Sequence, residues 1–365
     1  MAQRLRVAVI GSGIARIHVE QGFFRLGDLF EVPVLCSLDE ERGRALTADL
    51  GLAEFTPDFS SVLGRDDIDL VDICTPPGSH FELSRAAIAA GKHVICEKPL
   101  FGSVAEVDAM AGIVAGSGRT FMPIFQYRYG AGLQKLKHLV DRGLTGKAYM
   151  TTIETHWWRP PPYYSVPWRG KWATELGGGL LGHAIHAHDM LNYIHGPTEE
   201  VFAYGATLVN PIEVEDNAAL ALRMRNGSLA ALSMTLGSRE QISRLRFCFE
   251  NLVAESIRDQ PYAPARDPWR FVAEDAALQA GIDAALAEVP AAEEGFARQF
   301  ELFHEAVMAG TAPPVTLEDA RRSLELVTAA YHSMRTGRPT PLPIASGHPL
   351  FRSWLPEGIS PASPG

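Results

Sequence analysis

Two short segments hold the side chains best suited to proton chemistry. The first, Glu97-Lys98-Pro99-Leu100, follows an apolar run typical of a buried strand. A lysine at the carboxyl end of a parallel strand points into the crevice where open α/β sheets bind ligands. Pro99 keeps Lys98 extended and permits a cis peptide. A solvent-exposed lysine paired with Glu97 is the alternative, but the position favours Lys98 in charge stabilisation or proton transfer.

The second segment follows the glycine run 177–179 and contains His183, His186, His188 and Asp189. The three-residue spacing places His183 and His186 on one face of a predicted helix. A separate apolar stripe on this helix is formed by Leu180, Ala184, Ala187, Leu191 and Ile194. Because histidine titrates near neutral pH, we expect His186 to transfer a proton, with His183 assisting. Packing is one alternative; metal binding is another, but His188 points away from His186, so we expect no metal.

A glycine-rich turn, Gly11-Ser12-Gly13, directly follows the apolar run 5–10 and opens a helical stretch. Glycines at such a turn let the backbone approach a pyrophosphate, which a helix N-terminus stabilises. The usual third small residue would stand at Arg16, whereas Ala15 lies one place earlier. An ordinary tight turn is the alternative. We predict a dinucleotide contact by Gly11, Ser12, Gly13, Ile14 and Ala15.

The residues after the next strands indicate which dinucleotide would bind. A carboxylate at the end of the second strand favours NAD, and Ser37 stands there while Asp39 lies two residues on. NADP is therefore slightly preferred, unless Asp39 reaches back to the ribose. His80 would cap the following helix or contact the cofactor. Further cofactor contacts are predicted for Thr75, Pro76, His80, Glu97 and Lys98.

The first 125 residues alternate short apolar runs with helical stretches, which predicts a doubly wound parallel sheet. The predicted strands are 5–10, 32–38, 68–74, 93–96 and 120–125. This arrangement is a Rossmann-type α/β domain over residues 1–125.

The following segment changes to alternation with a period of two. Leu220, Leu222 and Met224 are separated by small or charged residues, and Asn226-Gly227 is a two-residue hairpin signal. Two late helices are predicted from apolar spacings that begin at Phe296 and Ala320. Residues 126–355 are therefore expected to form an α+β domain with an open, mainly antiparallel sheet, whose late helices can pack on the first domain. Residues 356–365 are predicted to be a flexible tail.

Composition narrows the class of protein. With 46% hydrophobic and 21% charged residues, 365 residues suit two globular domains, without an apolar run long enough to cross a membrane. The net charge of -10 argues against a nucleic-acid partner. Scattered cysteines predict reduced thiols, and the absence of a secretory pattern after Met1 predicts a cytoplasmic location.

Together these residues resemble the Gfo/Idh/MocA family of oxidoreductases over nearly the whole chain. The most specific marks are Glu97-Lys98-Pro99, the glycine-run helix ending in His186-Ala187-His188-Asp189, and the run from Phe296 to Pro339. The resemblance implies a nicotinamide cofactor, a sugar, inositol or related polyol substrate, and catalysis by Lys98 and His186. It also implies a homodimer or homotetramer formed through the open sheet.

One departure from the family is Gly182, because the family usually has Asp, sometimes Asn, four residues before the histidine. His183 beside it is a possible substitute. Aromatic and cationic residues elsewhere suit a sugar surface, although domain packing is an alternative for them. The predicted substrate-binding residues are Lys98, Tyr127, Arg128, Trp158, Trp168, Arg169, His183 and His186.

The resemblance predicts hydride transfer between a nicotinamide and a secondary alcohol or ketone. His186 would take the hydroxyl proton and Lys98 would stabilise the developing alkoxide. Two alternatives stay open: a glycosidase or lyase that uses bound NAD transiently, and a non-catalytic NAD(P)-binding sensor, which Gly182 makes plausible.

Overall fold

The computed structural model describes residues 3–257 and 260–362, which form two compact units. Unit 1 contains the chain up to Gln126, the segment Gly295–Ala320 and Ala362. Unit 2 contains the described parts of Tyr127–Glu294 and Arg321–Pro361. Residues 363–365 of the predicted tail lie outside the described residues.

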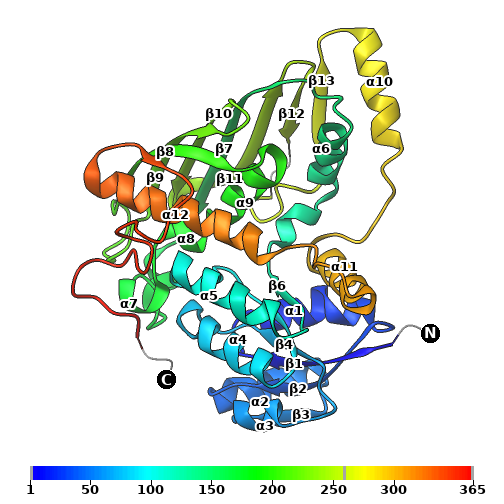
Figure 1. Cartoon of the computed structure of the whole chain (residues 1–365), viewed down its shortest axis with the longest axis vertical. Helices are drawn as coiled ribbons and strands as arrows, with labels where there is room; N and C mark the ends of the chain where they lie inside the picture. The colour runs from blue at the N-terminus through cyan, green and yellow to red at the C-terminus, as the bar shows by residue number, and fades with distance from the viewer. Residues whose placement is uncertain (1–2, 258–259, 363–365) are drawn as a thin grey trace. The chain divides into compact units, whose positions relative to one another are not determined.

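Unit 1 is built on six parallel strands in the order β3-β2-β1-β4-β5-β6 (Figure 1). The strands are β1 (Leu5–Ile10), β2 (Phe30–Cys36), β3 (Glu54–Thr56), β4 (Leu70–Ile73), β5 (His93–Cys96) and β6 (Phe121–Pro123). Its helices are α1 (Ala15–Gln21), α2 (Glu40–Leu50), α3 (Phe59–Leu63), α4 (His80–Ala89), α5 (Val104–Ala115) and α11 (Gly295–Ala309). The predicted doubly wound sheet is confirmed, but β3 was missed because this short edge strand is only partly buried.

The central strands of unit 1 meet closely where the glycine turn begins. Every residue of β4 is buried, as are the last four of β1. Gly11 has φ +100°, and a Cβ added there would lie 2.8 Å from the Cys74 carbonyl oxygen. Only glycine permits both this conformation and this close approach at the carboxyl edge of the sheet.

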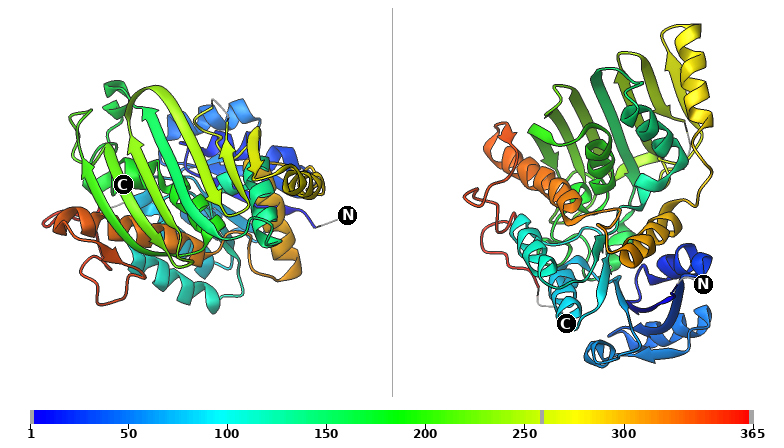
Figure 2. Two further views of the ribbon diagram at one scale, coloured as in Figure 1. Left: turned by 90° about the horizontal axis from the view of Figure 1, so that it is seen from above. Right: turned by 45° about the vertical axis from the view of Figure 1, so that its right-hand side comes forward.

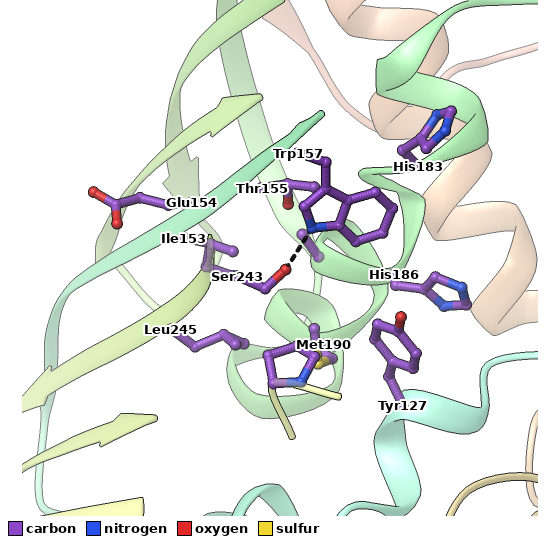
Figure 3. Close-up of a pocket in the computed structure, with 12 residues that line it drawn as sticks. Tyr127, Ile153, Glu154, Thr155, Trp157, His183, His186, Met190, Ser243 and Leu245 are labelled. Atoms are coloured by element: carbon purple, nitrogen blue, oxygen red, sulfur yellow. Dashed lines mark hydrogen bonds between the residues drawn. The ribbon is translucent and has the colours of Figure 1, made fainter. Parts of the chain in front are cut away.

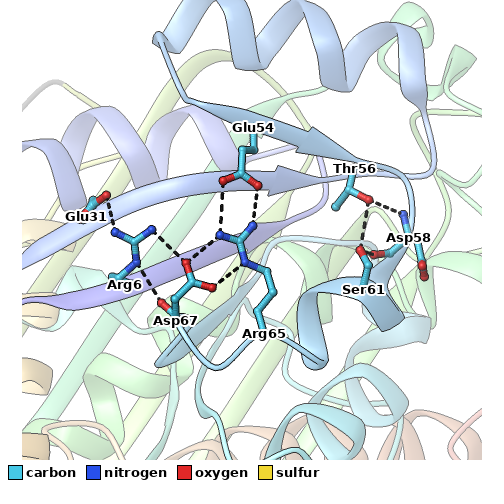
Figure 4. Close-up of polar contacts among 8 residues, drawn as sticks. All are labelled: Arg6, Glu31, Glu54, Thr56, Asp58, Ser61, Arg65 and Asp67. Carbon is cyan, nitrogen blue, oxygen red and sulfur yellow. Dashed lines mark hydrogen bonds and ion pairs between the residues drawn. The ribbon is translucent and has the colours of Figure 1, made fainter.

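An ion-pair network joins the strands at the opposite edge (Figure 4). Arg6 contacts Glu31 at 2.7 Å and Asp67 at 3.0 Å, while Arg65 contacts Glu54 at 2.6 Å. Hydrogen bonds from Arg65, reinforced by Arg6, hold the pKa of Asp67 below its usual range. Since these side chains are largely exposed, the network aligns strand ends more than it stabilises the fold.

Helix α11 packs its aromatic residues onto the start of the chain. Phe300 stacks on Phe23 with ring centroids 4.4 Å apart, and Phe296 lies 4.6 Å from the ring of His18. The apolar spacing predicted for this late segment therefore forms a buried face, which encloses His18.

Unit 2 is built on an eight-stranded mixed sheet in the order β13-β12-β11-β7-β10-β9-β8-β14. The strands are β7 (Ala148–Trp158), β8 (Thr198–Ala206), β9 (Asn217–Met224), β10 (Leu229–Thr235), β11 (Gly237–Phe249), β12 (Leu252–Ser256), β13 (Trp269–Ala273) and β14 (Thr340–Pro341). Only the pair β7 and β10 is parallel among the described pairings. The Asn226-Gly227 hairpin joins β9 to β10 as predicted, with Gly227 at φ +86°.

Helices cover one face of this sheet and leave the other in solvent. Unit 2 contains α6 (Ala131–Asp141), α7 (Trp172–Glu175), α8 (Gly179–Gly182), α9 (Ile185–His195) and α10 (Ala276–Ala287), while α12 (Leu317–Thr336) begins in unit 1. α9 packs on β7, and α8 packs on β9 and β10. The left view of Figure 2 looks onto the opposite face of the sheet. By strand alternation Tyr204 and Leu229 belong to this face, and both are more than half exposed. Among the described residues, no helix combines the length and apolarity needed to cross a membrane.

Candidate functional site

The glycine turn and the end of β2 lie side by side at the carboxyl edge of unit 1. The Ser37 hydroxyl donates to Ser12 Oγ at 3.2 Å, which places Ser37 directly beside the turn Gly11 to Ala15. Asp39 is instead the N-cap of α2, where its carboxylate accepts the Arg42 N–H at 3.0 Å. The side-chain-free surface at Gly11 and Gly13 suits a dinucleotide, and Asp39 is already engaged with its own helix.

His80 connects two neighbouring loops of this edge. Its Nε2 lies 2.8 Å from the carbonyl oxygen of Thr75, and its Nδ1 lies 3.1 and 3.0 Å from those of Pro99 and Leu100. The capping interpretation is wrong, since His80 is the first helical residue and its ring faces these carbonyls. Burial lowers the pKa of His80, and the backbone acceptors oppose that shift. His80 therefore fixes the loop after Thr75 and Pro76 to the loop that contains Lys98.

Lys98 lies just beyond β5, half-buried at the end of the strand. Its backbone N–H donates to Glu97 Oε2 at 2.8 Å, and the Lys98-Pro99 peptide is cis. Glu97 is buried, and its other oxygen lies 2.9 Å from His18 Nε2. The sequence predicted that Glu97 contacts the cofactor. These contacts instead favour a role in which Glu97 positions Lys98.

His18 is the centre of a buried polar cluster that sequence reasoning missed. Its Nδ1 lies 2.9 Å from Asp72 Oδ2 and 3.4 Å from Cys74 Sγ. Burial lowers the pKa of His18, but the attraction of Asp72 and Cys74 outweighs it, so the pKa is held well above its usual value. An imidazolium between Asp72 and Glu97 satisfies both carboxylates.

A signal for this cluster was present in the sequence. Asp72 interrupts an otherwise apolar strand, and a buried carboxylate requires a partner. Within the described residues, His18, Asp72 and Cys74 also form a group whose ligating atoms lie within 4.8 Å of one another. Hydrogen bonding between the imidazolium and its carboxylates accounts for this geometry without a metal.

The histidine segment of unit 2 is not the single helix that was predicted. α8 ends at Gly182, and α9 begins at Ile185. His183 is the C-cap of α8, with φ -118° and ψ -53°, whereas His186 belongs to α9. The predicted shared helical face of His183 and His186 is therefore wrong, because the chain bends between them.

A buried glutamate holds the start of α8. Glu215 accepts the N–H groups of Gly178 at 3.2 Å and Leu180 at 3.0 Å, and the Tyr331 hydroxyl at 3.1 Å. Burial raises the pKa of Glu215 to about 7, although these donors oppose the shift. The hydrogen bonds fix the backbone that leads to His183.

A small pocket of unit 2 brings His183 and His186 together despite the bend (Figure 3). Tyr127 stacks on His186 with ring centroids 4.2 Å apart and an interplanar angle of 18°. Trp157 forms another wall and donates its Nε1–H to Ser243 Oγ at 2.9 Å. The remaining lining residues are Ile153, Glu154, Thr155, Ala187, Met190, Leu245 and Pro264.

His183 Nε2 accepts two hydrogen bonds at the pocket wall. Arg159 Nε and the Tyr163 hydroxyl each lie 3.2 Å from it. Arg169 in turn donates to the Tyr163 hydroxyl and stacks on the Trp168 ring at 4.3 Å. With Nε2 as the acceptor, His183 is a neutral imidazole that bears its proton on Nδ1. Arg159 and Tyr163 lie in the stretches 157–160 and 163–172, whose aromatic residues suited a sugar surface, but neither was named as a predicted site residue.

Other predicted residues lie away from the pocket wall. Arg128 is buried and forms a bidentate ion pair with Asp189 at 2.7 and 2.5 Å. This contact favours a role for Arg128 in anchoring α9, whereas the sequence predicted that it binds the substrate. His188 is fully buried, and neither ring nitrogen has a hydrogen-bond partner among the described residues. Burial lowers the pKa of His188 to about 3, so it is neutral.

Strand alternation separates the two adjacent tryptophans of β7. Trp157 is buried and lines the pocket, whereas Trp158 stacks under Arg239 at 3.7 Å. Successive residues of a strand point to opposite faces, so Trp157 lines this pocket and Trp158 does not. The period of two from Ile153 and Thr155 would have predicted from the sequence that Trp157 faces the same side as these two residues.

Comparison with known proteins identifies this architecture. Residues 5–125 match the model of the oxidoreductase family with an NAD-binding Rossmann fold, and residues 133–254 match the GFO/IDH/MocA C-terminal domain. The chain belongs to the Gfo/Idh/MocA family of oxidoreductases. Myo-inositol 2-dehydrogenase of Thermotoga maritima is 32% identical over 235 residues, which cover 62% of this chain and 67% of that protein.

Solved structures agree with this family. The WlbA dehydrogenase of Bordetella pertussis, in complex with NADH and UDP-GlcNAcA, has a TM-score of 0.82 at 27% identity, covering 94% of this chain and all of that one. A levoglucosan dehydrogenase in complex with NADH and levoglucosan has a TM-score of 0.81 at 22% identity, covering the same shares. The second likeness supports the fold alone.

Within the Gfo/Idh/MocA family, the departure at Gly182 has a structural counterpart in this chain. A Cβ added to Gly182 would lie 3.9 Å from Glu175 Oε1. The Glu175 carboxylate is buried, accepts the Gly170 N–H at 2.5 Å and lies 3.7 Å from Arg169. A carboxylate therefore stands beside Gly182, the position where the resemblance predicts an Asp. Because it comes from another short helix, no local sequence signal predicts it.

Proposed function

We propose that this chain is an NAD(P)-dependent dehydrogenase acting on a secondary alcohol, or the corresponding ketone, of a sugar, inositol or related polyol. The observation that carries the proposal is the pocket of unit 2, where His186 is held by Tyr127 beside Trp157 and His183. An imidazole suits the removal of a hydroxyl proton, and the indole and phenol rings suit the apolar face of a sugar. Myo-inositol and levoglucosan dehydrogenases among the relatives support this substrate class.

Unit 1 supplies the residues for the nicotinamide cofactor. The turn Gly11 to Gly13 would receive the pyrophosphate, and Ser37 would face the adenosine ribose. When bound, the cofactor accepts or returns the hydride. Ser37 and the helix-capping role of Asp39 support a slight preference for NADP, since no carboxylate at the strand end would repel a 2′-phosphate.

The chain's own residues would manage the proton. His186 takes it from the substrate hydroxyl in the oxidative direction and returns it in reduction. Lys98, positioned by Glu97 and by the loop that His80 fixes, stabilises the developing alkoxide. His183 is a neutral hydrogen-bonding group that orients the substrate or His186.

A substrate panel tests this proposal. Purified protein is assayed with inositols, aldoses and glycosides with either oxidised cofactor, and formation of reduced nicotinamide is followed by absorbance. Turnover with at least one secondary alcohol is expected. Absence of turnover across the panel, in both directions and with both cofactors, would refute the proposed function.

We also propose that the uncovered face of the eight-stranded sheet forms a homodimer or homotetramer. Its side chains at alternate positions include exposed Tyr204 and Leu229, and such apolar surface favours burial against a second copy. Light scattering at micromolar concentration is expected to give a dimer or tetramer mass. A monomer would contradict this assignment.

A further inference from the structure

An arginine beside the pocket carries a charge that the protein does not neutralise. Arg159 is half-buried, and its guanidinium carbon lies 5.1 Å from the Trp157 ring, 5.0 Å from the Tyr163 ring and 5.5 Å from the Tyr262 ring. None of the described carboxylates forms an ion pair with it. The rings attract the guanidinium, but a hydrogen-bonded anion stabilises a partly desolvated cation more strongly.

The surrounding bonds hold Arg159 rigidly. Its backbone N–H donates to the Leu236 carbonyl at 2.9 Å, and its carbonyl accepts the Asn210 side-chain amide at 3.1 Å. Its Nε donates to His183, and its Nη1 donates to the Trp158 carbonyl and the Tyr262 hydroxyl. Nη2 makes no hydrogen bond to any described residue, so one donor group of a fixed guanidinium stays available.

The charged groups that contact Arg159, Tyr163 and Arg169 leave an excess of one positive charge, and the carboxylate of Glu154, which also lines the pocket, points away from Trp157 (Figure 3). Arg159 and Arg169 are cationic, Glu175 faces Arg169 at 3.7 Å, and His183 is neutral as the acceptor between Arg159 and Tyr163. Burial raises the pKa of Tyr163, so its hydroxyl keeps its proton. One carboxylate on a ligand would balance this group.

We infer that the substrate is a sugar acid, a pyranose or related polyol that carries one carboxylate recognised by Arg159. Resting on the proposed function, this inference specifies its substrate class. The carboxylate would accept from Nη2 of Arg159, whose Nε donates to His183 at the pocket wall. A phosphate has a higher charge than the single unbalanced cation here, so a carboxylate is the better match.

The experiment uses pairs of sugars that differ only at carbon 6. Values of kcat/KM are measured for glucuronate against glucose and for galacturonate against galactose, with both cofactors. The acid is expected to exceed its neutral partner by at least about tenfold, the contribution of a charged hydrogen bond. Equal values, or preference for the neutral sugars, would overturn the inference while leaving the proposed dehydrogenase activity intact.

Variants assign the preference to Arg159. In Arg159→Gln the ratio of acid to neutral kcat/KM should fall at least about fivefold, and Arg159→Lys, which keeps the charge, should give an intermediate ratio. Arg239→Gln is the matched control, because Arg239 also stacks on a tryptophan of β7 but on the other sheet face. A ratio unchanged in Arg159→Gln, or equally reduced in Arg239→Gln, would contradict the assignment.

Calorimetry separates this inference from the proposed function. Glucuronate and glucose are titrated into the full chain with oxidised cofactor present. If none of the sugars is oxidised, tighter binding of glucuronate that is lost in Arg159→Gln would support the anion site alone. Failure to bind or oxidise either acid would overturn it. If Arg159→Gln does not fold, the inference is tested by the acid preference of the unmodified chain and by the ratio of acid to neutral kcat/KM in Arg159→Lys.

Discussion

The molecule contains two histidine clusters that use similar groups in opposite ways. In unit 1, His18 is fully buried, and its two ring nitrogens contact the carboxylates of Asp72 and Glu97. In unit 2, His183 lies beside a pocket between Arg159 and Tyr163, where a positive charge is left over. A buried ring whose two nitrogens both meet carboxylates indicates a structural cluster, whereas a ring that lines a pocket beside a cation without a carboxylate partner indicates a ligand site.

This comparison also separates the roles of neighbouring residues. Glu97 faces inward to His18 and positions the backbone of Lys98. His186 lines a pocket and stacks on the ring of Tyr127. The closed cluster should therefore control stability, and the open pocket should control turnover.

The largest expected effect is on turnover after removal of the proposed proton-transfer groups. General acids and bases contribute about 100- to 10,000-fold, so His186→Ala and Lys98→Ala should each lower kcat by that order. Cofactor affinity should stay within a few-fold, as measured by fluorescence titration. His183→Ala should lose less. If His183→Ala abolishes turnover while His186→Ala keeps it, the base is His183.

Replacement of His18 should mainly destabilise the chain. His18→Gln leaves two buried carboxylates without their cation, which should cost about 3–5 kcal/mol in the free energy of unfolding. Because the folded-state pKa of His18 is raised, its stabilisation is fully present below about pH 6.5 and is lost as pH rises through the folded pKa. Urea unfolding should show a larger deficit at pH 6 than at high pH. A deficit that grows with pH would contradict the imidazolium assignment.

Cofactor choice should change with a single residue at the end of β2. The unmodified chain should bind NADPH more tightly than NADH, and Ser37→Asp should weaken NADPH binding by about tenfold or more, or 1.4 kcal/mol. Dissociation constants from fluorescence titration provide the measurement. If the unmodified chain binds NADH tenfold more tightly, Asp39 recognises the ribose instead.

The smallest expected effect compares the two tryptophans of β7. Trp157→Phe should raise KM for the preferred sugar by about 2- to 10-fold, because an indole face contributes about 0.5–1.5 kcal/mol beyond its burial. Trp158→Phe is the matched change on the opposite sheet face and should alter KM less. A larger effect of Trp158→Phe would restore the original prediction for that residue.

Much of the fold could be predicted because it follows from local periodicity. The strand Leu5–Ile10 and the strand His93–Cys96 match their predicted limits, and the Asn226-Gly227 turn joins two strands as expected. The break at His183 was not predicted from the local spacing of the histidines. The start of α8 is held by Glu215, which lies in the loop before β9, far away in sequence.

The candidate site was predicted only in part for the same reason. His186 and Tyr127 were identified, and the structure brings them into contact. Arg159, Glu175 and His18 act through partners far away in sequence, which local spacing does not reveal. Trp157 was within reach, because alternation along β7 distinguishes it from Trp158.

The stoichiometry of a single turnover tests the central claim most directly. With excess oxidised cofactor and limiting substrate from the panel, the moles of reduced nicotinamide formed should equal the moles of sugar oxidised. Sugar consumed without net reduced nicotinamide would instead identify an enzyme that uses bound cofactor transiently. Tight cofactor binding without any sugar conversion would identify a sensor, and either result would contradict a dehydrogenase.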